Sequence, residues 1–290
     1  MVIVATDSCA SVPESLVADL GIQVIPYYLH SGEQTWRDGV DMRPDDFFEW
    51  VKTAVDWPTT ANPSSGEYLD VLRHSAQQQA AGVVIICMTS VGSGGFQAAE
   101  LAQRLAATEL PDLAVEVVDT QQVGMAHGWA VIQAARAALR GASLADVALE
   151  ARRVAASAFV AFTNDTLEYL QRGGRIGKVA SMVGELLSIK PILGIRNGMP
   201  VPLGVARTRQ KAYQRMISLA IGRIPTGKTV RAALMHVSAA DEAEKLRPLV
   251  EARYSVLEWL TTQLSPALGV HSGPGTVGIA LIPDATLAGG

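Results

Sequence analysis

The sequence predicts an α/β protein with two domains: an N-terminal domain built on a parallel sheet and a second α+β domain. Over residues 1–156, short apolar runs alternate with helical segments, the order that produces a parallel sheet covered on both faces. Over residues 157–290, an Asn197-Gly198 pair separates two apolar runs and predicts an antiparallel hairpin, which requires a different sheet. A chain of 290 residues is long enough to bury both cores.

The first domain opens with a strand, a polar turn and a helix. Residues 2–5 are apolar and residues 6–8 form the turn Thr-Asp-Ser, while Ser11 and Glu14 have the S-x-x-E spacing of a capping box. A second apolar strand is expected over residues 22–28. This segment therefore predicts the first strand-helix-strand unit of a parallel sheet.

The same order repeats to the end of the first domain. Ser64 and Glu67 form a second capping signal, in front of a helix that runs through Ala80. The elements expected after it are a strand at 83–88, a helix at 96–107, a strand at 114–118 and a helix at 125–139.

The second domain is expected to mix strands with short helices. Residues 172–178 form a glycine-hinged basic loop, and the hairpin joins residues 192–196 to residues 199–205. The other expected elements are a strand at 158–163, a helix at 166–171, a strand at 229–236, a helix at 240–254 and a last strand at 276–281.

Composition excludes several classes of function. With 24 basic and 28 acidic residues the net charge is −4, so the chain lacks a field that would bind nucleic acid. Cys9 and Cys87 are too few for a disulfide framework and are expected to be buried thiols in a reducing cytoplasm. The N-terminal residues do not have the pattern of a secretory signal, and the longest apolar run, residues 83–88, is far shorter than the roughly 20 residues of a membrane span. No His, Cys and carboxylate cluster has metal-ligand spacing, so no metal is expected.

One segment matches a nucleotide-binding pattern in an unsuitable context. Residues 222–229 fit the phosphate-loop pattern G-x-x-x-x-G-K-[ST]. A phosphate loop leaves a strand and opens a helix, whereas here a helical segment at 211–221 comes first and an apolar strand follows. We interpret it as a helix-to-strand turn. A dinucleotide site is not expected at residues 92–95 either, because Gln97 stands where the last glycine of G-x-G-x-x-G is required.

The loops that follow the strands of the first domain form the predicted binding region. Ligands of parallel α/β sheets collect at the carboxyl ends of the strands. The loops in question are residues 6–8, 89–95 and 119–121, and all three are polar or rich in small residues. Residues 57–64 form a further loop, in which hydroxyl side chains lie between two prolines; such rigid donors suit an anion, and a plain connection is the other interpretation.

Ser93 and His271 are the candidates for chemistry. Ser93 is a helix-capping hydroxyl, a ligand contact or a nucleophile. His271 lies in a segment that we predict to be a loop, because it is too rich in glycine for a helix, and its imidazole is expected at a surface or cleft. A hydrolase remains an alternative, since Ser93, His271 and a carboxylate such as Asp7 or Asp119 can converge from separate loops as a triad.

Together these segments resemble the DegV family, and the resemblance extends over nearly the whole chain. Residues 58–64 stand where the family has a Pro-x-Thr-Ser-Gln-Pro-Ser loop, and residues 89–95 stand where it has a serine-rich loop ending in Ser-Gly-Thr. The other matching segments are residues 6–8, 167–176, 187–193 and 271–275. The resemblance implies a long-chain fatty acid bound between the two domains and, as in some members, a carrier that presents the acyl carboxylate to a separate kinase.

The resemblance also implies roles for individual residues. Thr60 and Ser93 would bind the fatty-acid carboxylate as hydroxyl donors, with His271 completing the polar end. The supporting loop residues would be Ser8, Asn62, Gly94 and Gly95, and the residues on the kinase or phosphate side Arg172, Arg175 and Arg207. Two departures from the family pattern each remove a hydroxyl: Gly95 replaces a threonine, and Ala61-Asn62 replaces Ser-Gln.

We therefore expect a cytoplasmic carrier of a long-chain fatty acid without catalytic residues or a cofactor. Its expected partners are the fatty acid, a fatty acid kinase subunit and, transiently, a membrane surface. The alternative from a different class is a serine-dependent esterase or thioesterase that uses Ser93 and His271. A third hypothesis is a site for a small anion or a phosphorylated metabolite at the carboxyl edge of the sheet.

Overall fold

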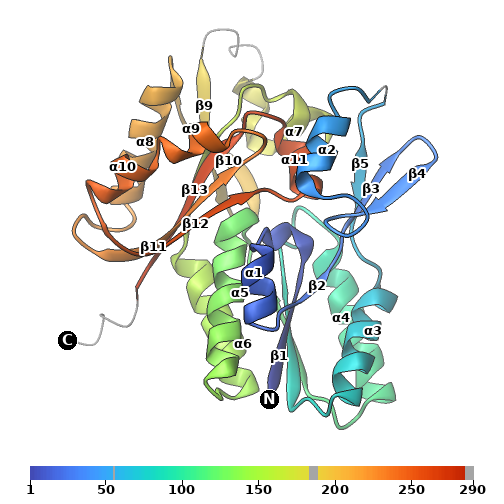
Figure 1. Cartoon of the computed structure of the whole chain (residues 1–290). Coiled ribbons are helices and arrows are strands. Elements are labelled where there is room, and N and C mark those ends of the chain that lie inside the picture. Colours follow the sequence, from blue (N-terminus) through green and yellow to red (C-terminus); the bar gives the residue numbers. More distant parts are fainter. Residues whose placement is uncertain (55, 183–188, 285–290) are drawn as a thin grey trace.

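A four-stranded parallel sheet forms the base of the molecule (Figure 1). The computed structural model describes residues 1–54, 56–182 and 189–284. The strands of this sheet lie in the order β2-β1-β6-β7, and each neighbouring pair is parallel. Their bounds are Val2–Asp7 for β1, Gln23–Ile25 for β2, Gly82–Cys87 for β6 and Val115–Asp119 for β7. The predicted parallel sheet is confirmed.

Helices cover both faces of this sheet because its central strands are apolar on both sides. Val84 and Ile86 of β6 pack with α5 and α6, whereas Val83 and Ile85 pack with α3 and α4. This alternation follows from the two-residue period of a strand. The helices are α1 (Glu14–Asp19), α3 (Ser65–Gln77), α4 (Gly95–Glu109), α5 (Gly124–Leu139) and α6 (Leu144–Ser157). Of these, α6 was not among the predicted elements.

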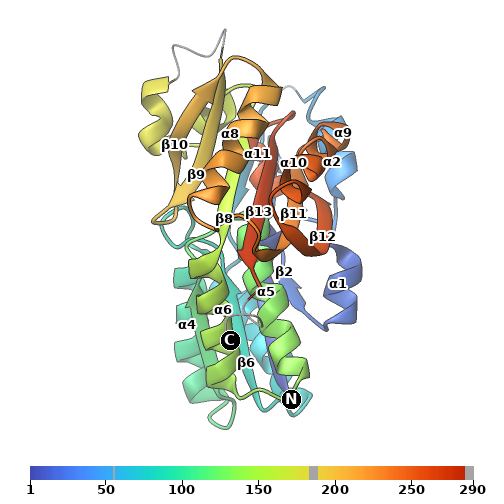
Figure 2. The same ribbon diagram turned by 90° about the vertical axis from the view of Figure 1, so that its left-hand side faces the viewer.

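A six-stranded, mainly antiparallel sheet lies above the first one (Figure 2). Its order is β10-β9-β8-β13-β11-β12, in which only the β11–β12 pair is parallel. The predicted hairpin is confirmed, with Asn197 and Gly198 at φ values of 49° and 76°. The strands are β8 (Phe159–Thr163), β9 (Lys190–Arg196), β10 (Met199–Ala206), β11 (Thr229–His236), β12 (Ser255–Gln263) and β13 (Val277–Pro283).

The two faces of the second sheet pack against different partners. Its outer face is covered by α8 (Arg209–Ile221), α9 (Ala240–Glu244) and α10 (Arg247–Glu251). Its inner face packs on α5, where Trp129 and Ile132 join the same core as Met235 and Ala280. Helix α5 is therefore buried along nearly its whole length between the two sheets. Since α6 ends at Ser157 and β8 begins at Phe159, the two sheets use separate stretches of chain; the domain boundary at 156/157 stays a prediction.

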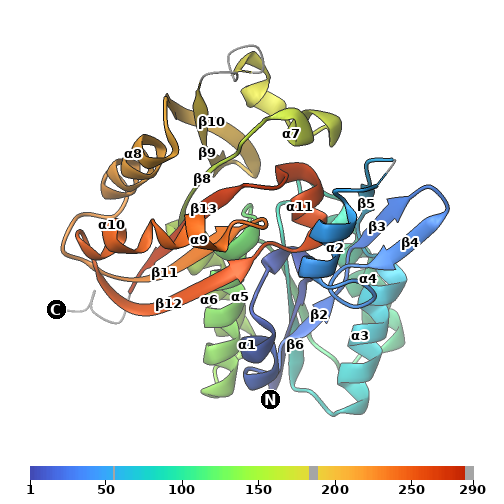
Figure 3. The same ribbon diagram turned by 45° about the horizontal axis from the view of Figure 1, so that its top comes forward.

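A third, three-stranded sheet lies at the side of the molecule beside α2 and α11 (Figure 3). Its order is β4-β3-β5, with bounds Gln34–Arg37 for β4, Tyr28–Ser31 for β3 and Thr59–Ala61 for β5. Helix α2 covers Pro44–Trp50 and α11 covers Pro266–Ser272. The other described elements are α7 (Glu168–Arg172) and two 3-10 turns (Ser8–Ala10 and Gly177–Met182). This small sheet and α2 were not predicted.

Several local predictions are wrong. Ser11 does not cap α1: it adopts a left-handed conformation after the turn at Ser8–Ala10, and its Oγ accepts a hydrogen bond from Ser265 N. The expected strand at 22–28 ends at Ile25, and the expected helix at 240–254 is two short helices followed by the unpredicted strand β12.

Other local predictions are confirmed. The capping box at Ser64 and Glu67 is complete, and residues 222–229 are a turn between α8 and β11, as interpreted. Within the described residues, none of the helices combines the length and apolarity that crossing a membrane requires. Residues 187 and 188 of the segment at 187–193 lie outside the described residues.

Candidate functional site

A cavity opens where the three sheets meet, and its walls are mostly apolar. The first domain contributes the loop after β6 and the β5 strand with its following loop. The second sheet and α11 contribute aliphatic and aromatic side chains, among them Phe162, Ile195, Met235 and Leu268. Its polar lining includes Thr60, Asn62, Ser93, Arg175 and His271. The cavity is therefore amphipathic, and it joins loops that are far apart in the sequence.

Thr60 and His271 meet at the polar end. Thr60 lies on β5, and its Oγ1 is 2.9 Å from Nε2 of His271 in the last turn of α11. The prediction that His271 lies in a loop too rich in glycine to be helical is thus wrong. The helix begins with Ser265 as its N-cap and Pro266 in its first turn, so the glycines follow the imidazole rather than surround it.

Burial keeps the His271 imidazole neutral. Its pKa is lowered to about 4, first because the ring is removed from water and then because the Arg175 guanidinium is close. Nδ1 is buried and has no hydrogen-bond partner within the described chain. Gly173 lies against this nitrogen, since a Cβ at that position would be 2.0 Å from it. These surroundings favour the tautomer in which Nε2–H donates to Thr60, and the Thr60 hydroxyl hydrogen is then free to donate into the cavity.

Ser93 presents a second hydroxyl to the same cavity. Its Oγ is 2.6 Å from the Tyr27 hydroxyl and accepts a 3.3 Å hydrogen bond from Gly95 N at the start of α4. Tyr27 is 4% exposed and lines the cavity, and the sequence predicted it only as part of a strand. No local signal distinguished it, because its partner is 66 positions away.

Arg175 borders the cavity beside the hydroxyls. Its Nη1 donates to Gly173 O at 2.6 Å and its Nε donates to Gly92 O at 3.3 Å. The basic loop that carries Arg175 is thereby held against the loop that carries Ser93. The side chain brings a positive charge to the polar end of the cavity.

The other predicted site residues are distributed unevenly. Asn62 and Gly94 line the cavity, and the Asn62 amide donates to Pro63 O. Neither Gly95 nor Ser8 lines the cavity: Gly95 is buried at the start of α4, and the Ser8 hydroxyl donates to Asp38 and accepts from Tyr27 N. Outside the cavity are Arg172, which is exposed and ion-paired with Glu168, and Arg207, which is exposed in the turn between β10 and α8.

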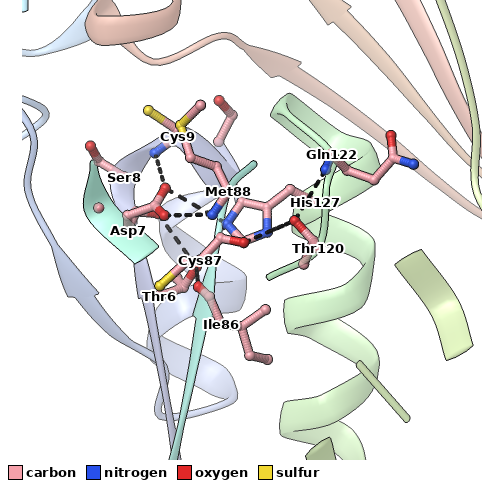
Figure 4. Close-up of polar contacts among 12 residues, drawn as sticks. Thr6, Asp7, Ser8, Cys9, Ile86, Cys87, Met88, Thr120, Gln122 and His127 are labelled. Carbon is pink, nitrogen blue, oxygen red and sulfur yellow. Dashed lines mark hydrogen bonds and ion pairs between the residues drawn. The ribbon is translucent and has the colours of Figure 1, made fainter. Parts of the chain in front are cut away.

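A buried polar cluster fixes the loops at the carboxyl edge of the parallel sheet (Figure 4). The Asp7 carboxylate accepts from Met88 N at 2.8 Å and from Cys9 N at 3.1 Å, which ties the end of β1 to the start of the Ser93 loop. His127 of α5 lies between the hydroxyls of Thr6 and Thr120, at 3.1 and 3.2 Å. The cluster was not predicted. The feature of the sequence that could have indicated it is that Thr6, Asp7 and Thr120 all lie at the ends of parallel strands.

Neither Asp7 nor Asp119 forms a catalytic triad with Ser93 and His271. Asp119 accepts from Ser90 N and Ser90 Oγ, and Asp7 is occupied by the two backbone amides. Nε2 of His271 bonds Thr60, and within the described chain the recorded partners of Ser93 Oγ are Tyr27 and Gly95. Within the described chain, no hydrogen bond therefore links Ser93 to His271 or His271 to either carboxylate.

Comparison with known proteins shows the same architecture elsewhere. The family model described as "Uncharacterised protein, DegV family" matches residues 1–284. Protein DegV of Bacillus subtilis is 31% identical over 277 residues, covering 95% of this chain and 97% of that protein. A DegV family protein of Thermus thermophilus, whose structure is described in terms of fatty acid binding, is 32% identical with a TM-score of 0.89, covering 97% of this chain and 99% of that one. A stearic acid-binding protein of Eubacterium ventriosum is 26% identical with a TM-score of 0.88, covering 99% of both chains.

These similarities run through the parallel sheet, the second sheet and the loops that form the cavity, so they concern the whole fold rather than one motif. On this evidence the chain belongs to the DegV family.

Proposed function

We propose that this protein binds a long-chain fatty acid in the cavity, with the carboxylate at Thr60, Ser93 and His271 and the alkyl chain along the apolar walls. The observation that carries the proposal is that the Thr60 and Ser93 hydroxyls and the His271 imidazole line one cavity whose walls are mostly apolar. The fatty-acid-binding relatives of Thermus thermophilus and Eubacterium ventriosum support it.

The two ends of such a ligand contribute differently to binding. At about 0.8 kcal/mol per buried methylene, roughly 14 methylenes contribute on the order of 11 kcal/mol before the costs of association are subtracted. Burying the carboxylate is unfavourable unless it is hydrogen-bonded. The hydroxyls of Thr60 and Ser93 would offset that cost and orient the headgroup. The alkyl chain therefore dominates affinity, and the polar end determines orientation.

We further propose that the protein is a cytoplasmic carrier that presents the carboxylate to a separate kinase and performs no catalysis itself. Arg175 borders the polar end of the cavity, and the exposed Arg172 lies on the adjacent helix α7. With Arg207, these side chains would face the kinase or the phosphate that it transfers. Contact with a membrane surface, from which a fatty acid is collected, would be transient.

The first experiment is native mass spectrometry of the purified protein, followed by denaturation and organic extraction. We expect about one fatty acid per chain. A protein that is isolated empty and does not take up added oleate or palmitate would contradict the proposal.

The Ser93→Ala variant tests whether Ser93 orients the carboxylate rather than retaining the fatty acid. Because the alkyl chain supplies most of the affinity, the variant should still retain lipid but should lose acyl phosphate formation when it is combined with a fatty acid kinase. The measurement is extracted lipid per chain beside the rate of acyl phosphate formation. Ser90→Ala is the control, since the Ser90 hydroxyl bonds Asp119 instead of lining the cavity. Complete loss of lipid in Ser93→Ala would contradict the division of roles.

The esterase hypothesis is tested by labelling with a fluorophosphonate. Since His271 bonds Thr60, we expect Ser93 to remain unmodified under conditions that label a serine esterase fully. Stoichiometric modification of Ser93, located by peptide mass spectrometry, would instead favour the enzyme.

A further inference from the structure

We infer that Tyr27 is a positioning residue for the headgroup, which directs the Ser93 hydroxyl hydrogen into the cavity and so favours a carboxylate over a neutral headgroup. The inference rests on the proposed function and goes beyond it, because Tyr27 belongs to none of the loops predicted to hold the ligand. It depends on the hydrogen bonds around Ser93 and on the space beside Gly95.

The Tyr27 side chain is held in one place. Its backbone N donates to Ser8 Oγ at 3.1 Å and its backbone O accepts from Asp38 N at 2.8 Å, so the main chain is fixed on both sides. The ring is 4% exposed and packs in the core that includes Cys9 and Met88. The hydroxyl therefore reaches Ser93 from a rigid base.

The direction of the hydrogen bond follows from counting donors and acceptors. Within the described chain, Ser93 Oγ is the one recorded partner of the Tyr27 hydroxyl. If Ser93 donated, the phenolic hydrogen would have no acceptor within the described chain, which is costly for a side chain of a residue that is 4% exposed. If Tyr27 donates, Ser93 Oγ accepts from both Tyr27 and Gly95 N, and its own hydrogen points to a third group. The cavity is where a carboxylate oxygen can accept it.

Tyr27 remains a donor at every physiological pH. Burial raises the pKa of the phenol well above its ordinary value, and the nearby Asp7 carboxylate raises it further. A phenolic donor also polarises the hydroxyl to which it donates, which strengthens the hydrogen bond that Ser93 in turn makes to an anion.

Gly95 makes this arrangement possible. A Cβ at position 95 would lie 2.8 Å from the Tyr27 hydroxyl and 3.3 Å from that of Tyr68, closer than a side chain tolerates without displacing its neighbour. Position 95 has no side chain of its own, and the space beside it is filled by the tyrosine hydroxyl. The pair of Tyr27 and Gly95 thus supplies a hydroxyl at the base of the headgroup site.

The test compares binding of palmitate with binding of hexadecanol, measured by displacement of a fluorescent fatty acid. Tyr27→Phe keeps the ring and removes the hydroxyl; we expect palmitate to bind about 3- to 10-fold more weakly and hexadecanol to change by less than about 2-fold. In a Ser93→Ala background, Tyr27→Phe should have no further effect on palmitate, because Tyr27 acts through Ser93.

A second variant tests whether the Tyr27 hydroxyl requires the space beside Gly95. Gly95→Ala should weaken palmitate binding in the unmodified chain by displacing the Tyr27 hydroxyl, and should have little effect in the Tyr27→Phe chain, where that hydroxyl is gone. Thermal unfolding of each variant establishes that it is folded.

The outcomes separate this inference from the proposed function. Palmitate binding that is unchanged in Tyr27→Phe, a loss equally large for hexadecanol, or a loss that persists in the Ser93→Ala background would overturn the role of Tyr27 alone. If the unmodified chain binds neither lipid, the proposed function fails and the inference fails with it.

Discussion

At the scale of single residues, the polar end of the cavity depends on two glycines as much as on the polar side chains. The His271 imidazole lies where a Cβ of Gly173 would be, and the Tyr27 hydroxyl lies beside the bare Gly95. Both glycines allow a hydrogen-bonding group to approach the backbone closely. The departure at Gly95 noted in the sequence accordingly removes one hydroxyl and makes room for another.

The neutral His271 makes stability depend on pH. Its folded pKa of about 4 lies below its ordinary value of 6.5, so the unfolded chain binds a proton first as the pH falls. The stabilising contribution is complete above pH 6.5 and is lost as the pH falls through about 4, with a size on the order of 3 kcal/mol. Urea unfolding at a series of pH values should show this decline.

The matched control is His271→Gln, which does not titrate in that range. Its free energy of unfolding should decline less between pH 6.5 and pH 4. Equal slopes in the two proteins would mean that His271 is not the group responsible.

At the scale of elements, predictions succeeded where the signal was local. The capping box of α3 is complete: Glu67 N donates to Ser64 Oγ at 3.3 Å, and Ser64 N donates to the Glu67 carboxylate at 2.8 Å. Ser11 and Glu14 have the same spacing, yet Ser11 is held by Ser265, which is 254 positions away. One pattern therefore gave a cap at one site and a tertiary contact at the other, because a distant partner can replace a local one.

The α3 cap is expected to contribute to stability. Ser64→Ala removes the acceptor for Glu67 N and should lower the free energy of unfolding by about 1 kcal/mol. The measurement is urea unfolding followed by circular dichroism. Ser218→Ala, at an exposed position within α8, is the control and should change stability by less than about 0.5 kcal/mol. Equal effects of the two substitutions would argue against the cap.

At the scale of the whole molecule, α5 joins the two sheets into one structure. Val131 packs in the core of the parallel sheet, while its neighbour Ile132 packs in the core beneath the second sheet. Arg136, one turn further on, forms a two-point ion pair with Glu258 of β12 at 2.7 Å. The helix thus packs in both cores and relates the loops of one sheet to the strands of the other.

Two substitutions on α5 test this coupling. Val131→Ala and Ile132→Ala each remove fully buried methyl groups and should each destabilise the protein by roughly 2 kcal/mol or more. Because both cores share the helix, both variants should lower the midpoint of one common thermal transition, measured by calorimetry and circular dichroism. Two separate transitions, with each variant shifting only one, would contradict the coupling.

The sequence predicted much of the fold and part of the site. The alternation of apolar runs and helices identified the parallel sheet, and Asn197-Gly198 identified the hairpin. The small sheet β4-β3-β5 escaped prediction because its strands have only three or four residues. Strands β3 and β4 form a local hairpin, whereas β5 joins them from a segment that is distant in the chain. Ser93 and His271 were candidates from the sequence itself and Thr60 was added by resemblance, and all three line the cavity. Tyr27 and the cluster around His127 were not predicted.

The sequence by itself determined what depends on neighbours along the chain: periodic burial, turns, caps and the order of elements. The tertiary structure alone decided which side chains meet, because Thr60 and His271 are separated by 211 positions and Tyr27 and Ser93 by 66. It also decided that His271 is neutral, since its pKa depends on burial and on Arg175. Local structure follows from short-range hydrogen bonding and from the spacing of apolar residues. A binding site depends on packing between distant segments, and no local sequence pattern shows which segments will meet.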